Sequence, residues 1–314
     1  MTSVLVVGSG SIGARHARNL ASLGAEVFLA DPDASRAAEV AAEVGATPVE
    51  FSSLMFAERD AVVVASPTGA HVAQASAALA AGARVLVEKP LVVTLDDFAA
   101  IEADAERIMV GYNLRLHQPI EQLMEMVHGG NVGDILNARL WFGFWLPDWR
   151  PGSDYRESYS ARSALGGGVL LDAIHELDLL VWLANGDAFD VVGAVVERLG
   201  PLEIDVEDTV AALLQHHDGW VADIALDYLS RSYRRGIEVV GTAGTARLDW
   251  ARQVVELEGS DGVRSWPATT PVSASYEREA ERFLAFVDGA PPVVGGAEGA
   301  QSVRLADAIR SAAR

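Results

Sequence analysis

Residues 3–31, SVLVVGSGSIGARHARNLASLGAEVFLAD, decide the fold of the first part of the chain. The run at 3–7 is apolar and rich in β-branched side chains, which is typical of a buried parallel strand. A glycine-rich turn follows, then apolar residues at helical spacing, and then a second apolar run at 25–30. A strand, a helix and a second strand in this order predict the first unit of a doubly wound α/β fold, with a parallel sheet between helices.

The turn after the first strand contains Gly8, Gly10 and Gly13, which fit the pattern G-x-G-x-x-G. In this pattern the first glycine allows a tight turn, the second lets the backbone approach a pyrophosphate, and the third lets the helix pack closely on the strand. The N-terminus of the helix also offers free N–H groups to phosphates. The turn therefore predicts dinucleotide binding, with Ser11 and Ile12 among the binding residues.

The second strand ends in Asp31, 23 residues after Gly8. An acid about 20 residues after the glycines accepts hydrogen bonds from the ribose hydroxyls of a dinucleotide. Its charge repels a 2′-phosphate, so Asp31 predicts that NAD is preferred to NADP. Arg36 follows nearby, and we interpret it as a residue on a solvated helix face. His16, on the helix after Gly13, is expected to affect cofactor binding.

Strand-like runs continue at 61–66, 84–90 and 107–113, and they alternate with helical segments. In such folds ligands bind outside the carboxyl ends of the strands. The candidates at these ends are Ser66, Pro67, Thr68, His71, Glu88 and Lys89 for the cofactor, and Lys89, Tyr112, Asn113 and Arg115 for the substrate. We therefore predict an NAD-binding Rossmann domain at 1–113.

Lys89 is the only lysine among 24 basic residues, and the other 23 are arginines. Alanine is also abundant, which indicates a biased genome that replaces lysine by arginine wherever either residue serves. An ammonium group is compact and can be deprotonated, whereas a guanidinium is planar and keeps its proton. Because Lys89 also follows a predicted strand, we interpret it as a functional residue.

From residue 114 onward the pattern changes, which predicts a second domain at 114–314. In WVADIALDY, residues 220–228, apolar side chains alternate as in a strand with one buried face. The run of strands predicts a mostly antiparallel sheet with helices on one face. The predicted strands are 132–146, 189–198, 208–217, 220–229, 236–241 and 245–258, and the predicted helices are 117–128, 170–184, 275–288 and 297–313.

Residues 146–168 are expected to form a long loop rich in aromatic residues and arginine. Aromatic faces stack on sugar rings or bases, and arginine pairs well with phosphate. The loop is therefore the best candidate for substrate contact. Its candidate residues are Trp149, Tyr155, Arg156, Tyr159 and Arg162.

The predicted helix at 170–184 carries Asp172, His175 and Glu176 at positions i, i+3 and i+4, which share one helix face. A histidine can take a hydroxyl proton near neutral pH, and a neighbouring carboxylate can orient it. Asp172 and His175 are therefore candidate catalytic and substrate-binding residues.

No metal site is predicted. His175 and Glu176 lack the second histidine, four residues after the first, that a zinc protease helix requires. The adjacent histidines His216 and His217 are expected to point to opposite faces of a strand. The G-x-S-x-G turn of many serine hydrolases is also missing from the sequence.

Composition excludes several classes of partner. With 44 acidic and 24 basic residues the net charge is −20, which repels nucleic acid and anionic lipid. The chain has no cysteine, so it forms no disulfide and uses no thiolate in catalysis. No apolar run approaches the ~18–20 residues that span a bilayer. The first residues lack the features of a signal peptide, so a cytoplasmic protein is expected.

Together these motifs resemble the Gfo/Idh/MocA oxidoreductases, which are named for glucose–fructose oxidoreductase, inositol dehydrogenase and a rhizopine-catabolism protein. The resemblance runs from residue 3 to about 250. The motifs that carry it are VVGSGSIGARHARNL at 6–20, ASPTGAHVAQASAALAAGARVLVEKPL at 65–91, VGYNLR at 110–115, GGGVLLDAIHELDLLVWL at 166–183 and IEVVGTAGTARLD at 237–249.

The resemblance implies a Rossmann domain followed by a domain with a large, open, mainly antiparallel sheet that builds homodimers or homotetramers. It implies hydride transfer between NAD and a secondary alcohol or ketone of a sugar or cyclitol. The lysine of E-K-P, often before a cis proline, and an Asp/His pair act on the substrate hydroxyl in this family. Carried over, these residues are Lys89, Asp172 and His175.

Many members separate the aspartate and the histidine by three residues, whereas only Ala173 and Ile174 intervene here. This spacing resembles a subgroup with D-x-x-H-E-x-D, which is associated with nucleotide sugars or surface glycans. It leaves open whether Asp172 is catalytic or only shapes the site. Two other activities of similar proteins remain alternatives, a glycosidase that retains its NAD and a non-catalytic NAD sensor or scaffold.

Overall fold

The structure is a computed structural model, which describes residues 1–313, and the chain divides into two compact units. Unit 1 contains Met1–Leu116 and Val272–Ala300, and unit 2 contains His117–Pro271 and the residues from Gln301 onward. The sequence predicts domains at 1–113 and 114–314. The units differ from that prediction chiefly because 272–300 returns to unit 1.

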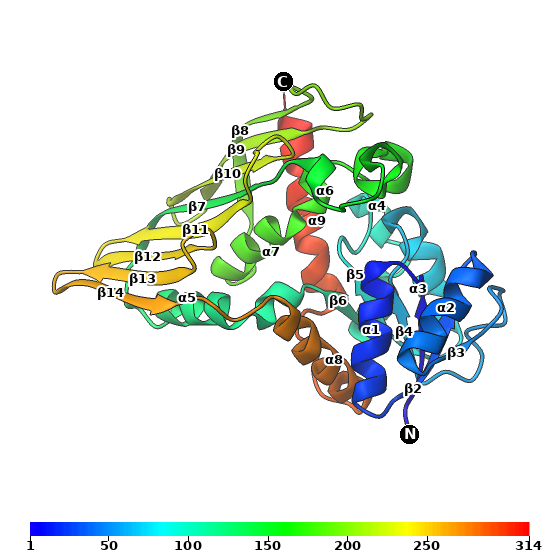
Figure 1. The fold of residues 1–314 in the computed structure, drawn as a ribbon. Helices are drawn as coiled ribbons and strands as arrows, with labels where there is room; N and C mark the ends of the chain where they lie inside the picture. Colours follow the sequence, from blue (N-terminus) through cyan, green and yellow to red (C-terminus); the bar gives the residue numbers. More distant parts are fainter. Residues whose placement is uncertain (314) are drawn as a thin grey trace. The chain divides into compact units, whose positions relative to one another are not determined.

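Unit 1 is built on a six-stranded parallel sheet with the order β3-β2-β1-β4-β5-β6 (Figure 1). This is the strand order of dinucleotide-binding folds, with helices on both faces of the sheet. The prediction of a doubly wound parallel sheet is thus confirmed. The strands are β1 (Ser3–Val7), β2 (Glu26–Ala30), β3 (Thr47–Pro48), β4 (Ala61–Val64), β5 (Arg84–Glu88) and β6 (Ile108–Gly111). The two-residue strand β3 was too short for the sequence pattern to predict.

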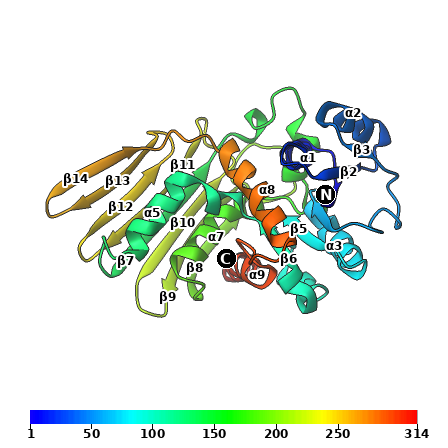
Figure 2. The same ribbon diagram turned by 90° about the horizontal axis from the view of Figure 1, so that it is seen from below.

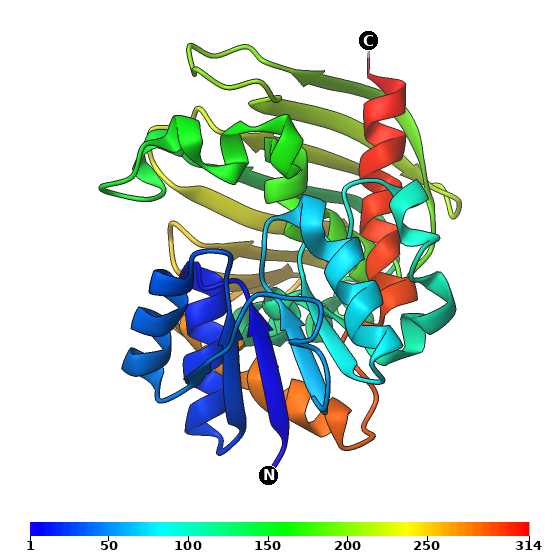
Figure 3. The ribbon, with the colours of Figure 1, turned by 90° about the vertical axis from the view of Figure 1, so that its right-hand side faces the viewer.

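The helices of unit 1 lie along this sheet, as Figure 3 shows for α1 and α2 in dark blue and α8 in orange. Phe283 and Phe286 of α8 are fully buried in the core cluster that also contains Val4 and Leu20. The burial of these phenylalanines explains why the chain returns to unit 1. The helices are α1 (Ser11–Ser22), α2 (Ala34–Val44), α3 (His71–Ala80), α4 (Leu95–Phe98) and α8 (Ser273–Val287), with short 3₁₀ turns η1 (Thr68–Ala70), η2 (Glu102–Arg107) and η3 (Asn113–Leu116).

Unit 2 contains an eight-stranded sheet with the order β14-β13-β12-β11-β7-β10-β9-β8. Only β7 and β10 pair in parallel, and every other neighbouring pair is antiparallel. The predicted large, mainly antiparallel sheet is therefore confirmed. The strands are β7 (Ile135–Gly143), β8 (Phe189–Glu197), β9 (Thr209–His216), β10 (Val221–Asp227), β11 (Arg234–Gly241), β12 (Gly244–Asp249), β13 (Val254–Gly259) and β14 (Gly262–Pro267).

One face of this sheet is covered by helices, and Figure 2 shows α5 and α7 lying across it. On that face Val210, Leu214, Ile224 and Leu226 are buried, whereas the alternate residues of β9 and β10 are exposed or half-buried. The covering helices of unit 2 are α5 (Gln118–His128), α6 (Val169–Asp172) and α7 (Ile174–Leu183). The last helix, α9 (Gly296–Ala312), begins in the sequence range of unit 1 and ends in that of unit 2.

The predicted loop at 146–168 is not a regular element, as expected, but it contains four short 3₁₀ turns. They are η4 (Leu146–Asp148), η5 (Tyr155–Glu157), η6 (Tyr159–Ala161) and η7 (Ser163–Leu165). Within residues 1–313, none of the helices has the length and apolar character needed to cross a bilayer.

Candidate active site

The glycine turn between β1 and α1 is closed on one side and open on the other. Gly8 has φ +101°, and a Cβ there would lie 2.6 Å from the carbonyl oxygen of Ala65. A Cβ on Gly13 would lie 1.8 Å from the carbonyl oxygen of Gly8. Around Gly10, by contrast, an added Cβ would meet no atom within 4 Å. Backbone packing thus requires glycine at positions 8 and 13, whereas Gly10 leaves space for a ligand.

The N-terminus of α1 faces this space without a side-chain cap. Gly10 is the N-cap, and the first turn contains no acidic residue. Uncapped N–H groups at a helix N-terminus bind phosphate, because they donate hydrogen bonds and carry the positive end of the helix dipole. The open turn and the uncapped helix fit the pyrophosphate of NAD.

Asp31 lies at the carboxyl end of β2, beside the glycine turn. Its Oδ2 accepts a hydrogen bond from the Ser9 N–H at 2.7 Å, and its Oδ1 accepts one from the Asp33 N–H at 2.9 Å. These bonds hold the carboxylate in one orientation. Arg36 is exposed on α2, in agreement with its assignment to a solvated helix face, and its Nη2 also lies 3.5 Å from Asp31 Oδ1. A guanidinium therefore stands next to the acid that is expected to bind the ribose.

His71 lies between the carboxyl ends of β4 and β5. Its buried ring places Nε2 2.9 Å from the carbonyl oxygen of Ser66 and Nδ1 3.0 Å from that of Pro90. Burial lowers the pKa of His71 below its usual range, so the ring is neutral and donates through one nitrogen only. Both nitrogens face backbone carbonyl oxygens, and the nitrogen that carries the proton bonds to one of the two strand ends. The predicted contact of His71 with the cofactor stays a prediction.

Lys89 directly follows β5, and its side chain is half-buried. The Lys89–Pro90 peptide bond is cis, which agrees with the family pattern. Before it, Glu88 is buried and its Oε1 lies 2.7 Å from Nε2 of His16. His16 is therefore engaged with the strand end, although the sequence predicts a role in cofactor binding.

The residues that follow β6, which the sequence predicts to contact substrate, are shielded from solvent. Tyr112, Asn113 and Arg115 are all buried. Asn113 Nδ2 donates to Ser275 Oγ of α8 at 2.7 Å, and Arg115 forms an ion pair with Glu298. These polar groups tie the turn η3 to segments at the C-terminal end of the chain. Their predicted contact with substrate stays a prediction, and these bonds favour a structural role for Asn113 and Arg115.

In unit 2, Asp172 accepts hydrogen bonds from two tyrosines. Tyr228 donates to Oδ2 at 2.9 Å, and Tyr159 donates to Oδ1. Burial, followed by the charge of Asp172, raises the pKa of both phenols well above the usual range. Both hydroxyls therefore stay protonated and donate. With each oxygen engaged in this way, Asp172 is suited to shaping the site rather than to taking a proton.

The predicted helix at 170–184 is interrupted, so the expectation that Asp172, His175 and Glu176 share one face is wrong. Ala173, with ψ 29°, separates α6 from α7. Asp172 thus ends one helix, and His175 lies in the first turn of the next. Glu176 pairs with Arg235 of β11, with 2.6 Å between Oε1 and Nε. The break thus separates two carboxylates with different partners, since Asp172 bonds to Tyr228, which follows β10, and Glu176 bonds to Arg235.

The aromatic loop residues differ in their surroundings. The Trp149 ring packs edge-on against Tyr228, with 5.3 Å between ring centroids. Tyr155 accepts a hydrogen bond from the Glu203 N–H through its hydroxyl at 3.2 Å. Arg156 bonds to Asp154 and Glu203, and Arg162 lies 3.8 Å from Asp205. The two arginines already pair with acids, whereas Tyr159 bonds to Asp172 and Trp149 packs against Tyr228, which also bonds to Asp172.

His216 and His217 do not point to opposite faces, contrary to the sequence expectation. Strand β9 ends at His216, and the chain then turns, which brings the two ring centroids to 4.2 Å. Together with Asp187 they place possible ligand atoms within 4.8 Å of one another. However, the Asp218 N–H donates to His216 Nδ1 at 3.2 Å, so the neutral ring carries its proton on Nε2. A protonated Nε2 cannot bind a metal, and we assign no metal here.

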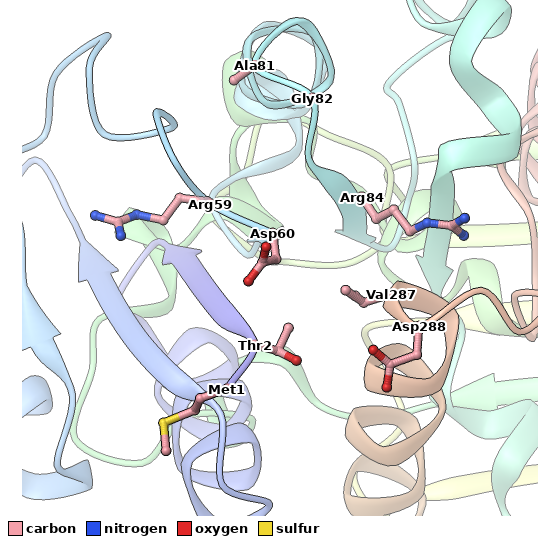
Figure 4. Close-up of a pocket in the computed structure, with 9 residues that line it drawn as sticks. All are labelled: Met1, Thr2, Arg59, Asp60, Ala81, Gly82, Arg84, Val287 and Asp288. Carbon is pink, nitrogen blue, oxygen red and sulfur yellow. The ribbon is translucent and has the colours of Figure 1, made fainter.

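A pocket of about 500 Å³ in unit 1 lies at the opposite edge of the sheet (Figure 4). Its residues include Thr2, Asp60 and Arg84, at the amino ends of β1, β4 and β5. Asp60 is already bonded to the backbone N–H of Ser3 at 2.8 Å. Ligands of parallel α/β sheets bind at the carboxyl ends, so this pocket is not the cofactor site.

Comparison with known proteins identifies the two parts of the chain separately. Residues 2–112 match the oxidoreductase family with an NAD-binding Rossmann fold, and residues 120–247 match the GFO/IDH/MocA C-terminal domain. The chain is 30% identical over 269 residues to inositol 2-dehydrogenase 3 of Saccharopolyspora erythraea, covering 81% of this chain and 75% of that protein.

The chain belongs to the Gfo/Idh/MocA oxidoreductase family.

Two further proteins are similar to nearly the whole chain. UDP-N-acetylglucosamine 3-dehydrogenase of Acidithiobacillus ferrooxidans is 26% identical over 301 residues, which are 92% of this chain and 89% of that enzyme. Its solved structure has a TM-score of 0.82 and covers 99% of this chain and 97% of its own. GenD2 from gentamicin A biosynthesis, solved in complex with NAD, is 25% identical with a TM-score of 0.84, covering 99% of this chain and 94% of its own.

Membership in the Gfo/Idh/MocA family confirms the predicted fold, the oxidoreductase class and NAD as the cofactor. The roles of the individual site residues stay predictions. Sequence reasoning missed Tyr228, which it placed only on the buried face of a strand. The signal was available, because a fully buried phenol requires a hydrogen-bond partner.

Tyr228→Phe should destabilise the protein by about 1.5–3 kcal/mol, because a buried hydrogen bond to a charged group is lost while the ring packing remains. Urea unfolding of the two proteins measures this difference. Tyr233→Phe is the comparison variant, because Tyr233 is exposed and solvent can replace the bond of its hydroxyl to Arg235. Equal unfolding midpoints for Tyr228→Phe and wild type would show that the bond to Asp172 contributes nothing.

Proposed function

We propose that this protein is a dehydrogenase or ketoreductase that acts on a secondary alcohol or ketone of a sugar, cyclitol or nucleotide sugar. NAD, when bound, supplies the hydride acceptor or donor. The observation that carries the proposal is the position of Lys89, the only lysine, at the carboxyl end of β5 in the unit that holds the glycine turn. The names of the relatives support the substrate class.

Each candidate residue has a distinct part in the proposed chemistry. His175 takes the proton of the substrate hydroxyl, or returns it in the reverse direction. Lys89 donates a hydrogen bond to the same oxygen and stabilises the charge that develops on it. Asp172, held by two tyrosines, orients the substrate or His175. Lys89 belongs to unit 1, and Asp172 and His175 belong to unit 2.

The experiment that tests the proposal is a screen for NADH formation. The panel contains myo-inositol, free sugars and UDP-N-acetylglucosamine, with 1,5-anhydro-D-fructose and other keto sugars assayed for NADH consumption in parallel. Steady formation or consumption of NADH supports the proposal. Glycoside cleavage without net NADH would favour the NAD-retaining glycosidase, and binding without turnover on the whole panel would favour the sensor.

Asp31→Ala should shift the cofactor preference from NAD toward NADP. The change removes the acceptor for the ribose hydroxyls and the charge that repels a 2′-phosphate, and it frees Arg36 to pair with that phosphate. Titration of both cofactors, followed by fluorescence, measures the two affinities.

The double variant Asp31→Ala/Arg36→Ala is the matched control, since it should weaken NAD binding without the gain in NADP binding. Wild-type protein that binds NADP more tightly than NAD would contradict the assignment of Asp31.

We also propose that the protein is cytoplasmic and forms homodimers or homotetramers through the uncovered face of its unit 2 sheet. That face carries exposed Val195 and Leu213. Arg139 and Asp223 on the same face form an ion pair with 3.1 Å between Nε and Oδ2. A mixture of apolar and paired charged residues suits an interface between copies of one chain. The mass in solution, measured by light scattering, tests this assembly.

A further inference from the structure

Three side chains form a buried cluster in unit 1, which we call the Glu88 cluster. His16 comes from α1, Glu88 from the end of β5 and Glu279 from α8. A nitrogen of His16 and a carboxyl oxygen of each glutamate lie within 4.8 Å of one another. His16 and Glu279 are each 1% exposed. Because two buried carboxyl groups lie this close together, the protonation state of each has to be assigned.

Both carboxyl oxygens of Glu88 have hydrogen-bond partners. Its Oε1 is bonded to His16 Nε2 at 2.7 Å, and its Oε2 accepts the backbone N–H of Lys89 at 3.1 Å. Gly111 on the neighbouring strand leaves room, because a Cβ there would lie 3.2 Å from the carboxyl group. Glu88 therefore anchors the backbone of Lys89.

Glu279 lies beside this carboxylate with no counter-charge of its own. Its Oε2 is buried and has no hydrogen-bond partner. Burial, followed by the charge of Glu88, raises the pKa of Glu279 well above its usual range. For Glu88 burial acts in the same direction, but the hydrogen bond and charge of His16 and the charge of Lys89 outweigh it and lower the pKa. Glu88 is thus the carboxylate and Glu279 the acid.

The other charged groups around the cluster do not change this assignment. His71 of α3 interacts with the charge of Glu88, but burial keeps its ring neutral. Arg15 of α1 lies over the ring of Tyr276, 4.5 Å from its centroid, one turn before Glu279. Neither group offsets the effect of burial on Glu279. Within the cluster, Glu279 is the neutral acid and Glu88 is the charged carboxylate. The Glu88 carboxylate can therefore accept the Glu279 proton.

We propose that Glu279 is a positioning residue for Lys89, because as an uncharged acid it shares its proton with the Glu88 carboxylate and keeps that carboxylate bonded to the Lys89 backbone. The consequence for catalysis rests on the proposed function, in which Lys89 contacts the substrate. A divalent cation held by the same three side chains is the competing account. The direct bond between His16 and Glu88 favours the shared proton.

The first test measures the reactivity of Lys89 in the full chain without substrate. Among amines, a pulse of acetic anhydride modifies only Lys89 and the N-terminal amine, and peptide mass spectrometry gives the ratio of these two products. Glu279→Leu should change the relative rate at Lys89 by about threefold or more, since the variant removes the proton that we propose Glu279 shares with the Glu88 carboxylate. Glu279→Gln keeps a donor without charge and should restore the wild-type rate.

Glu281→Leu and Glu281→Gln are the matched controls, because Glu281 is an exposed glutamate two residues further along α8. Both should leave the rate at Lys89 unchanged. Wild-type reactivity in Glu279→Leu would overturn the proposal, and so would loss of the wild-type rate in Glu279→Gln. One equivalent of a divalent metal ion in the purified protein, found by elemental analysis, would establish the cation instead.

The second test follows the melting temperature with pH. The folded protein keeps a proton on Glu279 that the unfolded chain releases above about pH 4.5, the ordinary pKa of the group. This contribution to wild-type stability is therefore complete below about pH 4.5 and is lost as the pH rises toward the raised pKa of the folded protein. Glu279→Gln has no such proton, so it should gain stability relative to wild type between about pH 5 and pH 8.

A difference in melting temperature that is independent of pH would overturn the proposal, because Glu279 would then have the same charge in both states. Neither test requires a sugar or turnover. If no compound of the substrate panel leads to formation or consumption of NADH, only the proposed function is overturned. Unchanged reactivity of Lys89 in Glu279→Leu would overturn the positioning role alone.

Discussion

Lys89→Arg should lower kcat/KM by about 10²-fold or more while NAD affinity stays near the wild-type value. The positive charge remains, but the guanidinium is planar, larger than an ammonium and unable to release its proton at working pH. Its bulk would also displace the substrate oxygen, and ~1 Å of misplacement is enough for a loss of this size. Steady-state kinetics and cofactor titration measure the two effects separately.

Arg18→Lys is the matched control for an exchange between lysine and arginine. Arg18 is suitable because it is exposed on α1, where it pairs with Glu43. It should leave kcat/KM unchanged. Chemical modification gives a second measurement, since an amine reagent should inactivate the protein in step with loss of Lys89. Bound NAD and substrate should slow that inactivation. If Lys89→Arg turns over at a rate near that of the wild type, the contribution of Lys89 is limited to its positive charge.

His175→Ala should lower kcat by about 10²–10⁴-fold, which is the usual loss when a positioned acid–base group is removed. His175 is buried at the start of α7 in unit 2, whereas the glycine turn and Asp31 belong to unit 1. NAD affinity should therefore change little. Rates measured across the pH range should also lose the dependence that reports the histidine.

His217→Ala is the control for His175, because His217 is an exposed histidine of the same unit and has no assigned role. Its rate should match that of the wild type at each pH. An unchanged rate for His175→Ala at several pH values would move the proton transfer to another group, and the tyrosines that hold Asp172 would then be tested in the same way.

The sequence by itself determined the features that depend on neighbours along the chain. The glycines at 8, 10 and 13 specify a turn whose backbone must pass close to a strand and a ligand, and that requirement is local. Alternation of apolar strands and helices then specifies a parallel sheet, and a parallel sheet places strand ends at one edge. The order of residues along the chain is therefore enough to assign Lys89 and Asp31 to that edge.

Tertiary structure alone decided which remote side chains meet. Glu279 lies 191 residues after Glu88, and Tyr228 lies 56 residues after Asp172, so no periodicity connects them. The break at Ala173 likewise lies between two residues with remote partners, because Asp172 bonds to Tyr228 and Glu176 bonds to Arg235. Buried polar groups must find partners wherever packing places them, and packing is a property of the folded chain.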